Sequence, residues 1–256
     1  MGERTSYPHG TFCFADLGTT DAAAAKAFYT GLFGWQADEQ PLPQGGVYVM
    51  LKRDGHDVAA LSEQQEDERS AGIPPHWNCY VAVDDVDAVA GRVRELGGDL
   101  MTEPFDVMDA GRMAVLRDPT GAIVSLWQAG RSIGATWVND PGSLTMTELA
   151  TPDPDRAAAF YEALLGWTTE VVDEASGYRS FKVGDWLNAG MRPDTSMPAN
   201  WVPYFTVASL DDALDRARSS GGAVFVDPVA IPAGRFAALA DPQGAVLCLF
   251  EGEVED

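Results

Sequence analysis

Apolar and polar residues near the start of the chain follow first a strand pattern and then a helix pattern. Residues 12–17 alternate with period 2, so that successive side chains are expected to point to opposite faces of a strand. An alanine-rich run follows, which Thr20 or Asp21 can cap at its start and Gly34 can end. The pattern therefore predicts a strand, a capped helix and a sharp stop.

The same pattern occurs again about halfway along the chain. The matching residues keep an offset of 132 positions (153 − 21), and such self-similarity indicates repeated modules. The two copies share Asp21, Phe28, Tyr29, Gly34 and Trp35 with Asp153, Phe160, Tyr161, Gly166 and Trp167. A second repeat, at an offset of 124 (201 − 77), matches Trp77, Tyr80, Val83 and Gly97-Gly98 with Trp201, Tyr204, Val207 and Gly221-Gly222. We therefore expect four βαβββ-like modules in two halves.

The remaining apolar and polar patterns predict the other strands and the second helix of the first half. In the first half, strands are expected at 46–51, 57–61, 77–83, 100–107, 112–117 and 122–127, with a helix at 84–96. The polar stretch 36–44 has no strand pattern, and the polar segment 62–75 is predicted to be a mobile loop beside the first site. The expected boundaries are an N-terminal domain at 8–129, a linker at 130–143 and a C-terminal domain at 144–252.

The repeated residues resemble a known family. A strand, a D-x-x-x-A-x-x-F-Y-x-x-L-x-G-W helix and a later D-P-x-G turn are similar to the vicinal oxygen chelate superfamily of glyoxalases, bleomycin resistance proteins and dioxygenases. The resemblance covers nearly all of the chain. It implies an α+β fold of tandem glyoxalase-like domains, in which pairs of modules form two open barrels, each around a cavity. Modules one and two can pair, or one with four and two with three.

Composition and charge limit the possible functions. The 256 residues suit two domains, each expected to bury its own core, and the net charge of −22 disfavours nucleic acids and anionic membranes as partners. No apolar run is long enough to span a bilayer and no signal peptide is recognisable, so a cytoplasmic location is expected. The three cysteines lack metal-type spacing and are expected to be buried thiols: Cys13, Cys79 and Cys248.

The resemblance also implies where a metal would bind. The family's ligand positions correspond to Phe14, Asn78 and Ser125 in the first half, and to Met146, Val202 and Cys248 in the second. None of the six is a His, Asp or Glu, the residue types that bind such divalent ions. We therefore expect no metal cofactor; a divalent ion, if one binds, is expected near His76.

Two apolar faces are the predicted ligand-binding surfaces. Period 2 and the resemblance together assign the following lining residues to the cavities: Phe12, Phe14, Tyr48, Met50, His76, Asn78, Ser125 and Trp127 in the first half, and Met146, Val202, Cys248 and Phe250 in the second. The alternative is that these aromatic side chains fill a closed core. The first half is expected to be the working site, because Asn78 and Ser125 can orient a ligand oxygen there.

Two carboxylates are predicted on the same inner faces. Asp16 and Glu148 occupy equivalent positions, and a carboxylate in an apolar pocket can act as an acid or base near neutral pH. The tyrosines Tyr80 and Tyr204 are the candidate hydrogen-bond donors beside these catalytic candidates. The favoured alternative is that Asp16 and Glu148 form ion pairs with the repeated arginines, Arg112 and Arg235.

These residues support two main classes of function. The first is a metal-independent enzyme that acts on a hydrophobic, oxygenated, natural-product-like metabolite. The second is a non-catalytic protein that binds and sequesters an aromatic small molecule, as bleomycin-resistance-type relatives do. A weaker third alternative is a metal-dependent glyoxalase-like lyase or dioxygenase. The expected partner is thus a hydrophobic or aromatic small molecule, and the protein is expected to be a monomer or a homodimer.

Overall fold

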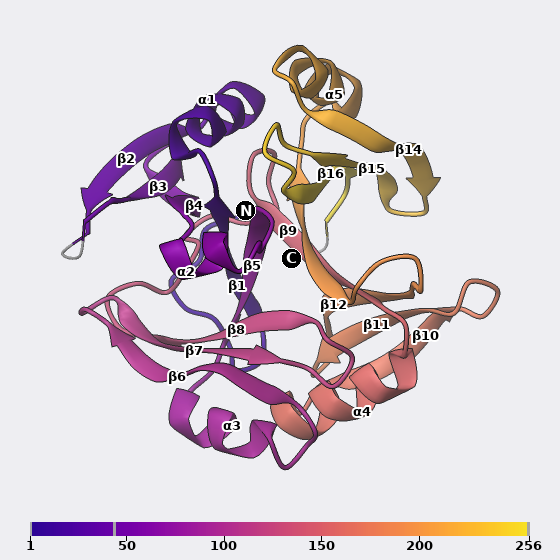
Figure 1. Ribbon diagram of the computed structural model, residues 1–256. Coiled ribbons are helices and arrows are strands. Elements are labelled where there is room, and N and C mark those ends of the chain that lie inside the picture. The colour runs from indigo at the N-terminus through magenta and orange to yellow at the C-terminus, as the bar shows by residue number, and fades with distance from the viewer. Residues whose placement is uncertain (1, 43–44, 255–256) are drawn as a thin grey trace.

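The computed structural model describes residues 2–42 and 45–254, which form two eight-stranded sheets flanked by helices (Figure 1). The elements of the first half are β1 (Phe12–Thr19), α1 (Ala22–Phe33), β2 (Gln36–Pro41), β3 (Val47–Arg53), β4 (His56–Glu63), α2 (Glu66–Ser70), β5 (His76–Ala82), α3 (Val86–Val93), β6 (Asp99–Val107), β7 (Gly111–Arg117) and β8 (Ile123–Ala129). Those of the second half are β9 (Leu144–Thr151), α4 (Pro154–Leu165), β10 (Thr168–Asp173), β11 (Tyr178–Val183), β12 (Trp186–Pro193), β13 (Asn200–Thr206), α5 (Leu210–Ser219), β14 (Ala223–Ile231), β15 (Gly234–Ala240) and β16 (Val246–Gly252).

Each sheet is an open barrel built from two consecutive modules. The first sheet has the strand order β2-β3-β4-β1-β5-β8-β7-β6, and the second has the equivalent order β10-β11-β12-β9-β13-β16-β15-β14. At the centre of each sheet the first strands of the two modules pair antiparallel, β1 with β5 and β9 with β13. The predicted α+β class and the open barrels are confirmed. Modules one and two share one sheet, and modules three and four share the other.

The helix-side cores are shared between the two halves, contrary to the expectation that each domain buries its own core. One cluster of buried residues joins α1 of module one to α5 of module four, and another joins α3 of module two to α4 of module three. Figure 1 shows these helices side by side, α1 with α5 and α3 with α4. An amphipathic helix on the outside of a curved sheet leaves its second face exposed unless another helix covers it. Here the other half of the chain supplies that helix.

The repeated motif residues explain this joining. Trp35 Nε1 donates to the carbonyl oxygen of Gly142 at 2.7 Å, and Trp167 Nε1 donates to that of Gly10 at 2.8 Å. Each acceptor belongs to the opposite half and lies just before its first strand: Gly10 precedes β1, and Gly142 precedes β9. The tryptophan that ends each repeated motif therefore attaches one half of the chain to the other.

Two polar segments contain secondary structure that the sequence pattern did not predict. In the stretch 36–44, Gln36–Pro41 forms β2, an edge strand whose residues are all exposed and which therefore has no apolar alternation. The segment 62–75 was expected to be a loop, but it contains the short helix α2, where Glu68 accepts a hydrogen bond from the backbone N–H of Gln65 at 2.8 Å. Residues 43 and 44 of the first stretch lie outside the described residues.

None of the helices in the described parts of the chain is long and apolar enough to cross a bilayer.

Candidate functional site

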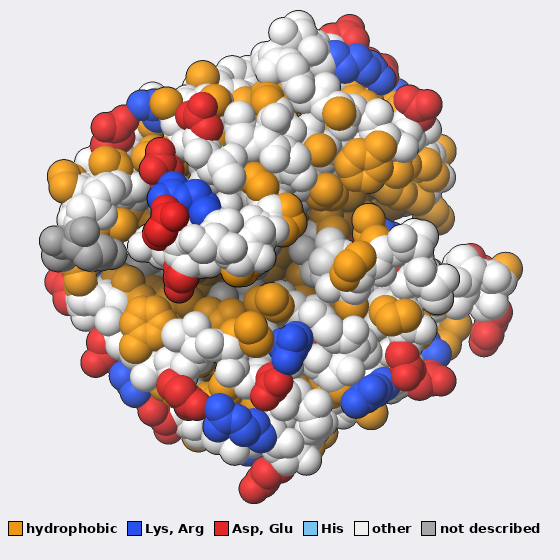
Figure 2. All heavy atoms as spheres, in the orientation of Figure 1, with side chains coloured by type: hydrophobic (Ala, Val, Ile, Leu, Met, Phe, Trp, Pro, Cys, Tyr) orange, Lys and Arg blue, Asp and Glu red, His pale blue; other side chains and the backbone are white. Residues whose placement is uncertain are grey.

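The inner face of the first sheet carries a cluster of buried apolar side chains that includes half of the lining residues predicted for it. Phe14, Tyr80 and Trp127 are buried there, with Tyr48 and Met50 packed against them. The ring centroids of Phe14 and Tyr80 are 6.1 Å apart, and those of Tyr80 and Trp127 are 6.2 Å apart in an edge-on arrangement. Figure 2 shows hydrophobic side chains gathered between α2 and the strands β6 to β8, and again over β14 to β16.

Asp16 on β1 is the polar centre of this face. Its Oδ2 accepts hydrogen bonds from the hydroxyls of Tyr48 at 3.0 Å and Tyr80 at 2.9 Å, and its Oδ1 accepts one from Nδ2 of Asn78 at 3.0 Å. The antiparallel register of β1 and β5 places Asp16 directly opposite Asn78, and Ser125 lies opposite Tyr80 on β8. The side chains thus come from four strands of one sheet, β3, β1, β5 and β8, and the sheet holds them together.

Burial dominates the electrostatics of this cluster. Asp16 is 8% exposed, and the loss of water raises the pKa of its carboxyl, while the three donors lower it in part. Burial also raises the pKa of the Tyr48 and Tyr80 hydroxyls well above the ordinary value, and the nearby Asp16 charge adds to this effect. Both tyrosines are therefore neutral hydrogen-bond donors over the whole physiological pH range.

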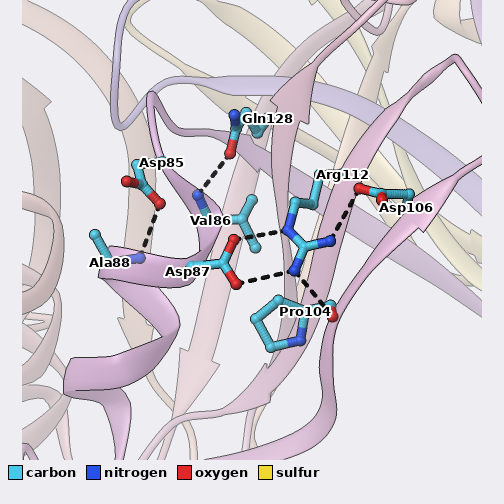
Figure 3. Close-up of polar contacts among 8 residues, drawn as sticks. All are labelled: Asp85, Val86, Asp87, Ala88, Pro104, Asp106, Arg112 and Gln128. Atoms are coloured by element: carbon cyan, nitrogen blue, oxygen red, sulfur yellow. Dashed lines mark hydrogen bonds and ion pairs between the residues drawn. The ribbon is translucent and has the colours of Figure 1, made fainter.

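The predicted ion pair between Asp16 and Arg112 was wrong. Arg112 donates to Asp87 on α3 through Nε and Nη2, and to Asp106 on β6 through Nη1 (Figure 3). Figure 3 also shows Nη2 reaching the carbonyl oxygen of Pro104. Arg112 therefore joins the exposed side of α3 to the β6–β7 ribbon and has no part in the inner face. Its counterpart Arg235 likewise binds Asp211 and Glu251 rather than Glu148.

Glu148 occupies the same position in the second half and does form an ion pair, with a residue that sequence reasoning missed. Nε of Arg192 on β12 lies 2.9 Å from Oε1 of Glu148, and Arg192 also contacts Asp194. Burial raises the pKa of Glu148, and the charge of Arg192 is the largest influence that lowers it. Asp16 and Glu148 are therefore equivalent in position but differ in electrostatic environment.

The remaining predicted residues of the second half lie together on its inner face. Val202, Tyr204, Cys248 and Phe250 form one buried cluster, with Met146 packed against it. Burial raises the pKa of the Cys248 thiol to about 12, and the neighbouring Glu148 adds to the shift. The face is more apolar than that of the first half, in agreement with the residues at these positions.

Phe12 does not lie on the inner face, contrary to the prediction. Its ring packs against Trp167 and Trp201 in the core shared by the two halves, with centroids 5.8 and 4.9 Å apart. The register of β1 against β5 shifts between Phe12 and Phe14, which indicates a β-bulge. One extra residue in a strand exchanges the faces on which the following side chains lie, so simple alternation fails there.

Two further residues, His76 and Gln64, lie beside the Asp16 cluster. Nδ1 of the half-buried His76 lies 2.8 Å from the carbonyl oxygen of Pro74. Gln64, which follows β4, is 3% exposed, and its Nε2 donates to the carbonyl oxygens of Ile73 and Pro74. His76 was predicted to be a ligand-binding residue, but Gln64 was missed because it stood in a segment expected to be a loop.

The six positions that the resemblance assigns to metal ligands do not fit a divalent ion. Phenylalanine, methionine and valine at three of these positions offer no oxygen or nitrogen ligand, and the one thiol, Cys248, is held protonated by its raised pKa. Asn78 and Ser125 offer only neutral oxygens, without the charge or the imidazole nitrogen that the family's ligand positions carry. Within residues 2–42 and 45–254, no group of three or more His, Cys, Asp or Glu side chains is placed to hold a metal ion. The donor set of a metal-dependent relative is thus missing from both inner faces as described.

Surface hollows of about 220 and 330 Å³ lie elsewhere, on the outer side of the first half. The first lies between α3 and β6, and the second lies around Gly97–Asp99 and the Asp118–Gly121 turn. Their walls mix charged and apolar residues and include neither Asp16 nor Glu148. A ligand-sized cavity over the inner faces stays a prediction.

Comparisons with known proteins agree with this geometry. The family model of the Glyoxalase/Bleomycin resistance protein/Dioxygenase superfamily matches residues 12–126, and a Glyoxalase-like domain model matches residues 146–250. "Putative glyoxylase CFP32" of Mycobacterium tuberculosis is 47% identical over 98% of both chains. The chain belongs to the glyoxalase/bleomycin resistance protein/dioxygenase superfamily. This superfamily member is also 36% identical to "Anthracycline biosynthesis protein DauV" of Streptomyces sp. (strain C5), over 96% of this chain and 95% of that protein.

Solved structures of the superfamily share the fold. The Mn(II)-bound glyoxalase from Novosphingobium aromaticivorans aligns with a TM-score of 0.67 at 17% identity, covering 100% of this chain and 85% of that chain. The 2,3-dioxygenase LapB from Pseudomonas sp. KL28 aligns with a TM-score of 0.66 at 16% identity, covering 97% of this chain and 94% of that chain. Likeness at this level of identity shows the architecture and carries no information on the reaction.

Proposed function

We propose that the first half is a metal-independent enzyme site for a flat, hydrophobic, oxygenated metabolite, with Asp16 as the general acid and base. The observation that supports this most directly is the environment of Asp16, a buried carboxyl whose hydrogen-bond donors, Tyr48, Tyr80 and Asn78, are all neutral. Because burial raises its pKa, Asp16 is better suited than an ordinary aspartate to exchange a proton near neutral pH.

Tyr80 would orient the substrate oxygen. Its hydroxyl donates to Asp16 and accepts a hydrogen bond from Ser125, so one lone pair of the Tyr80 oxygen is left to accept a hydrogen bond from a substrate hydroxyl. A proton can then pass from the substrate to Asp16 through the Tyr80 hydroxyl, which accepts one proton as it gives up another. Tyr48 donates to the same carboxyl oxygen and would hold Asp16 in position during the transfer.

The apolar part of the inner face would hold the body of the substrate. A row of paired residues crosses the sheet there, from Phe105 on β6 through Met113 on β7 to Trp127 on β8. Phe105 is 41% exposed and could close over a flat ring. The relatives named as anthracycline biosynthesis proteins support this substrate class, because anthracyclines contain flat, oxygenated ring systems.

The chemistry proposed is proton transfer, ring closure or addition–elimination. Each of these needs one acid or base and an oriented oxygen, which Asp16 and Tyr80 supply. The residues at the family's metal positions do not fit a divalent ion, so we propose that the reaction proceeds without one.

Turnover of a panel of hydroxyl- and carbonyl-bearing polycyclic compounds, followed by liquid chromatography and mass spectrometry, tests the proposal. Asp16→Asn keeps the shape of the side chain and should abolish conversion while sparing the binding of these uncharged compounds, which tryptophan fluorescence can follow. Asp54→Asn removes a charge from an exposed turn and is the matched control. Binding without conversion in the wild type would favour sequestration instead, and conversion lost on treatment with EDTA would contradict the metal-independent mechanism.

A further inference from the structure

The two halves carry different residues beside the inner carboxylate, and one of these differences changes the charge. On β1, Asp16 pairs with Ala60 and Gly18 pairs with Ser62. On β9, the corresponding partner of Ala150 is Arg192, whose Nε lies 2.9 Å from Glu148. Ser62 therefore stands in the first half where the second half has the arginine that neutralises its carboxylate.

The residue that pairs with Ser62 is a glycine, so no side chain projects from that position of β1. Gly18 occupies the position that Ala150 has in the second half. The atoms nearest to a Cβ built on Gly18 would be the Cγ of Gln64 at 3.5 Å and the ring of His76 at 3.6 Å, which are ordinary contact distances. The first half therefore has Ser62 paired with Gly18 where the second half has Arg192 paired with Ala150. The guanidinium and most of the arginine's aliphatic chain are absent from this side of the first site.

Two hydrogen-bond acceptors, on Gln64 and His76, lie near Gly18, and no described residue donates to them. Gln64 Oε1 is buried and has no hydrogen-bond partner among the described residues, although Gln64 Nε2 is held by two backbone carbonyls at 3.1 Å. Nδ1 of His76 lies 2.8 Å from the carbonyl oxygen of Pro74, which can only accept, so in the neutral imidazole the lone pair lies on Nε2. Nε2 is 3.9 Å from the Cβ position of Gly18. A buried acceptor without a donor is unfavourable unless a ligand or water supplies one.

Asp16 itself retains acceptor capacity. Its Oδ2 receives two tyrosine hydroxyls, but its Oδ1 receives only the Asn78 amide, and a carboxylate oxygen can accept two hydrogen bonds. A buried carboxylate is costly without a cation, and among the described residues no arginine or lysine pairs with Asp16, although the nearby His76 contributes to lowering its pKa. The net charge of −22 would attract cations to the protein as a whole.

We infer that the first half binds its ligand through a protonated amine, which lies between Asp16, Gln64 and His76 and takes the place that the Arg192 guanidinium has in the second half. An ammonium group has three N–H donors and no acceptor, which matches Asp16 Oδ1, Gln64 Oε1 and His76 Nε2. The inference rests on the proposed site and adds the class of ligand: a flat apolar body that carries an alkylammonium group.

The test compares two probes of the same shape, naphthylmethylamine and naphthylmethanol, by isothermal titration calorimetry with the full chain at neutral pH. The wild type should bind the amine at least about tenfold more tightly than the alcohol, as expected for a charge-assisted contact in a buried site. Asp16→Asn should bring the ratio of the two affinities close to one. Asp54→Asn removes the same charge from an exposed turn and should leave the ratio unchanged.

Ser62→Arg adds an independent test, because its guanidinium should occupy the amine position and pair with Asp16. This variant should lose the amine preference while its second half stays unaltered; amine binding equal to that of the wild type would place the amine elsewhere and overturn the inference. If Ser62→Arg does not fold, the isosteric Asp16→Asn variant decides.

Failure of the inference differs from failure of the proposed function. Equal affinity for the two probes in the wild type, or a preference that survives in Asp16→Asn, would overturn the amine site but leave an apolar binding face. Binding of neither probe to the wild type would count against both the amine site and the proposed function.

Discussion

The hydroxyl of Tyr29 donates to Oδ2 of Asp241 at 3.0 Å, although the two residues are 212 positions apart. The same hydroxyl accepts a hydrogen bond from Trp77 Nε1 at 3.2 Å, and all three side chains are buried. The equivalent set in the other pair of modules is Tyr161, Asp118 and Trp201. The tyrosine of the repeated F-Y motif and the aspartate of the D-P-x-G turn thus form hydrogen bonds between the two halves.

Replacement of Tyr29 by phenylalanine should destabilise the protein without changing its fold. The substitution leaves a buried carboxylate oxygen and the Trp77 N–H without their partner, which typically costs about 1–3 kcal/mol. The free energy of unfolding, measured by urea denaturation, provides the test. Glu103→Gln, which removes an exposed ion pair with Arg94, is the control and should cost less than about 1 kcal/mol. If both substitutions lower the free energy of unfolding by the same amount, the hydrogen bond between the two halves stabilises the protein no more than an exposed ion pair does.

Gly222→Ala should also destabilise the protein, by forcing apart α1 and α5. A Cβ on Gly222 would lie 3.0 Å from the ring of Phe28, the phenylalanine of the F-Y motif, so the ring or the backbone must move. Overpacking of this kind costs about 1–3 kcal/mol. Gly31→Ala is the matched control, because a Cβ there meets nothing within 4 Å and alanine favours the helix by about 0.5–1 kcal/mol. A stable Gly222→Ala variant would contradict the close packing.

The stability of the wild type relative to Asp16→Asn should fall as the pH rises. The folded state raises the pKa of Asp16 above its ordinary value of 3.8, chiefly through burial. Native Asp16 therefore binds its proton more tightly than unfolded Asp16, and the stability this provides is fully present below the unfolded pKa. That stability is lost as the pH rises through the folded pKa, where the buried carboxyl must ionise.

Urea denaturation of both proteins from acidic to neutral pH measures this difference. The amide oxygen that Asp16→Asn introduces can still accept the two tyrosine hydroxyls, and the Asn78 amide can rotate to accept from the new amide nitrogen, so the substitution preserves the network. A wild type that becomes more stable relative to the variant with rising pH would mean that the Asp16 pKa is lowered rather than raised.

The three thiols should resist labelling in the native protein. Cys13, Cys79 and Cys248 are all buried, and burial raises the pKa of Cys248 to about 12, so the reactive thiolate is scarce at mildly alkaline pH. Ellman's reagent should react with all three only after unfolding in guanidinium chloride. Rapid labelling of one equivalent in the native protein would show that one inner face opens to solvent.

Sequence reasoning predicted the inner-face cluster because most of β1, β5 and β8 follows strict alternation. Phe14, Asp16, Asn78 and Tyr80 lie where period 2 places them, and the register of β1 with β5 brings them together. Phe12 was misplaced because a β-bulge leaves no mark in the order of apolar and polar residues. Strand β2 was missed because every residue of this edge strand is exposed.

The sequence by itself determined the repeat, the family, the four modules and the positions of the inner carboxylates, because these depend on local pattern and on the self-match between the halves. It could not determine which arginine neutralises which carboxylate. Arg112 and Arg235 repeat but point outward, whereas Arg192, which does not repeat, reaches Glu148. Only the pairing of distant strands decides such a contact, because a side chain finds its partner across the sheet and not along the chain. For the same reason the tertiary structure alone showed that the helices of opposite halves share their cores, and that no arginine or lysine among the described residues pairs with Asp16.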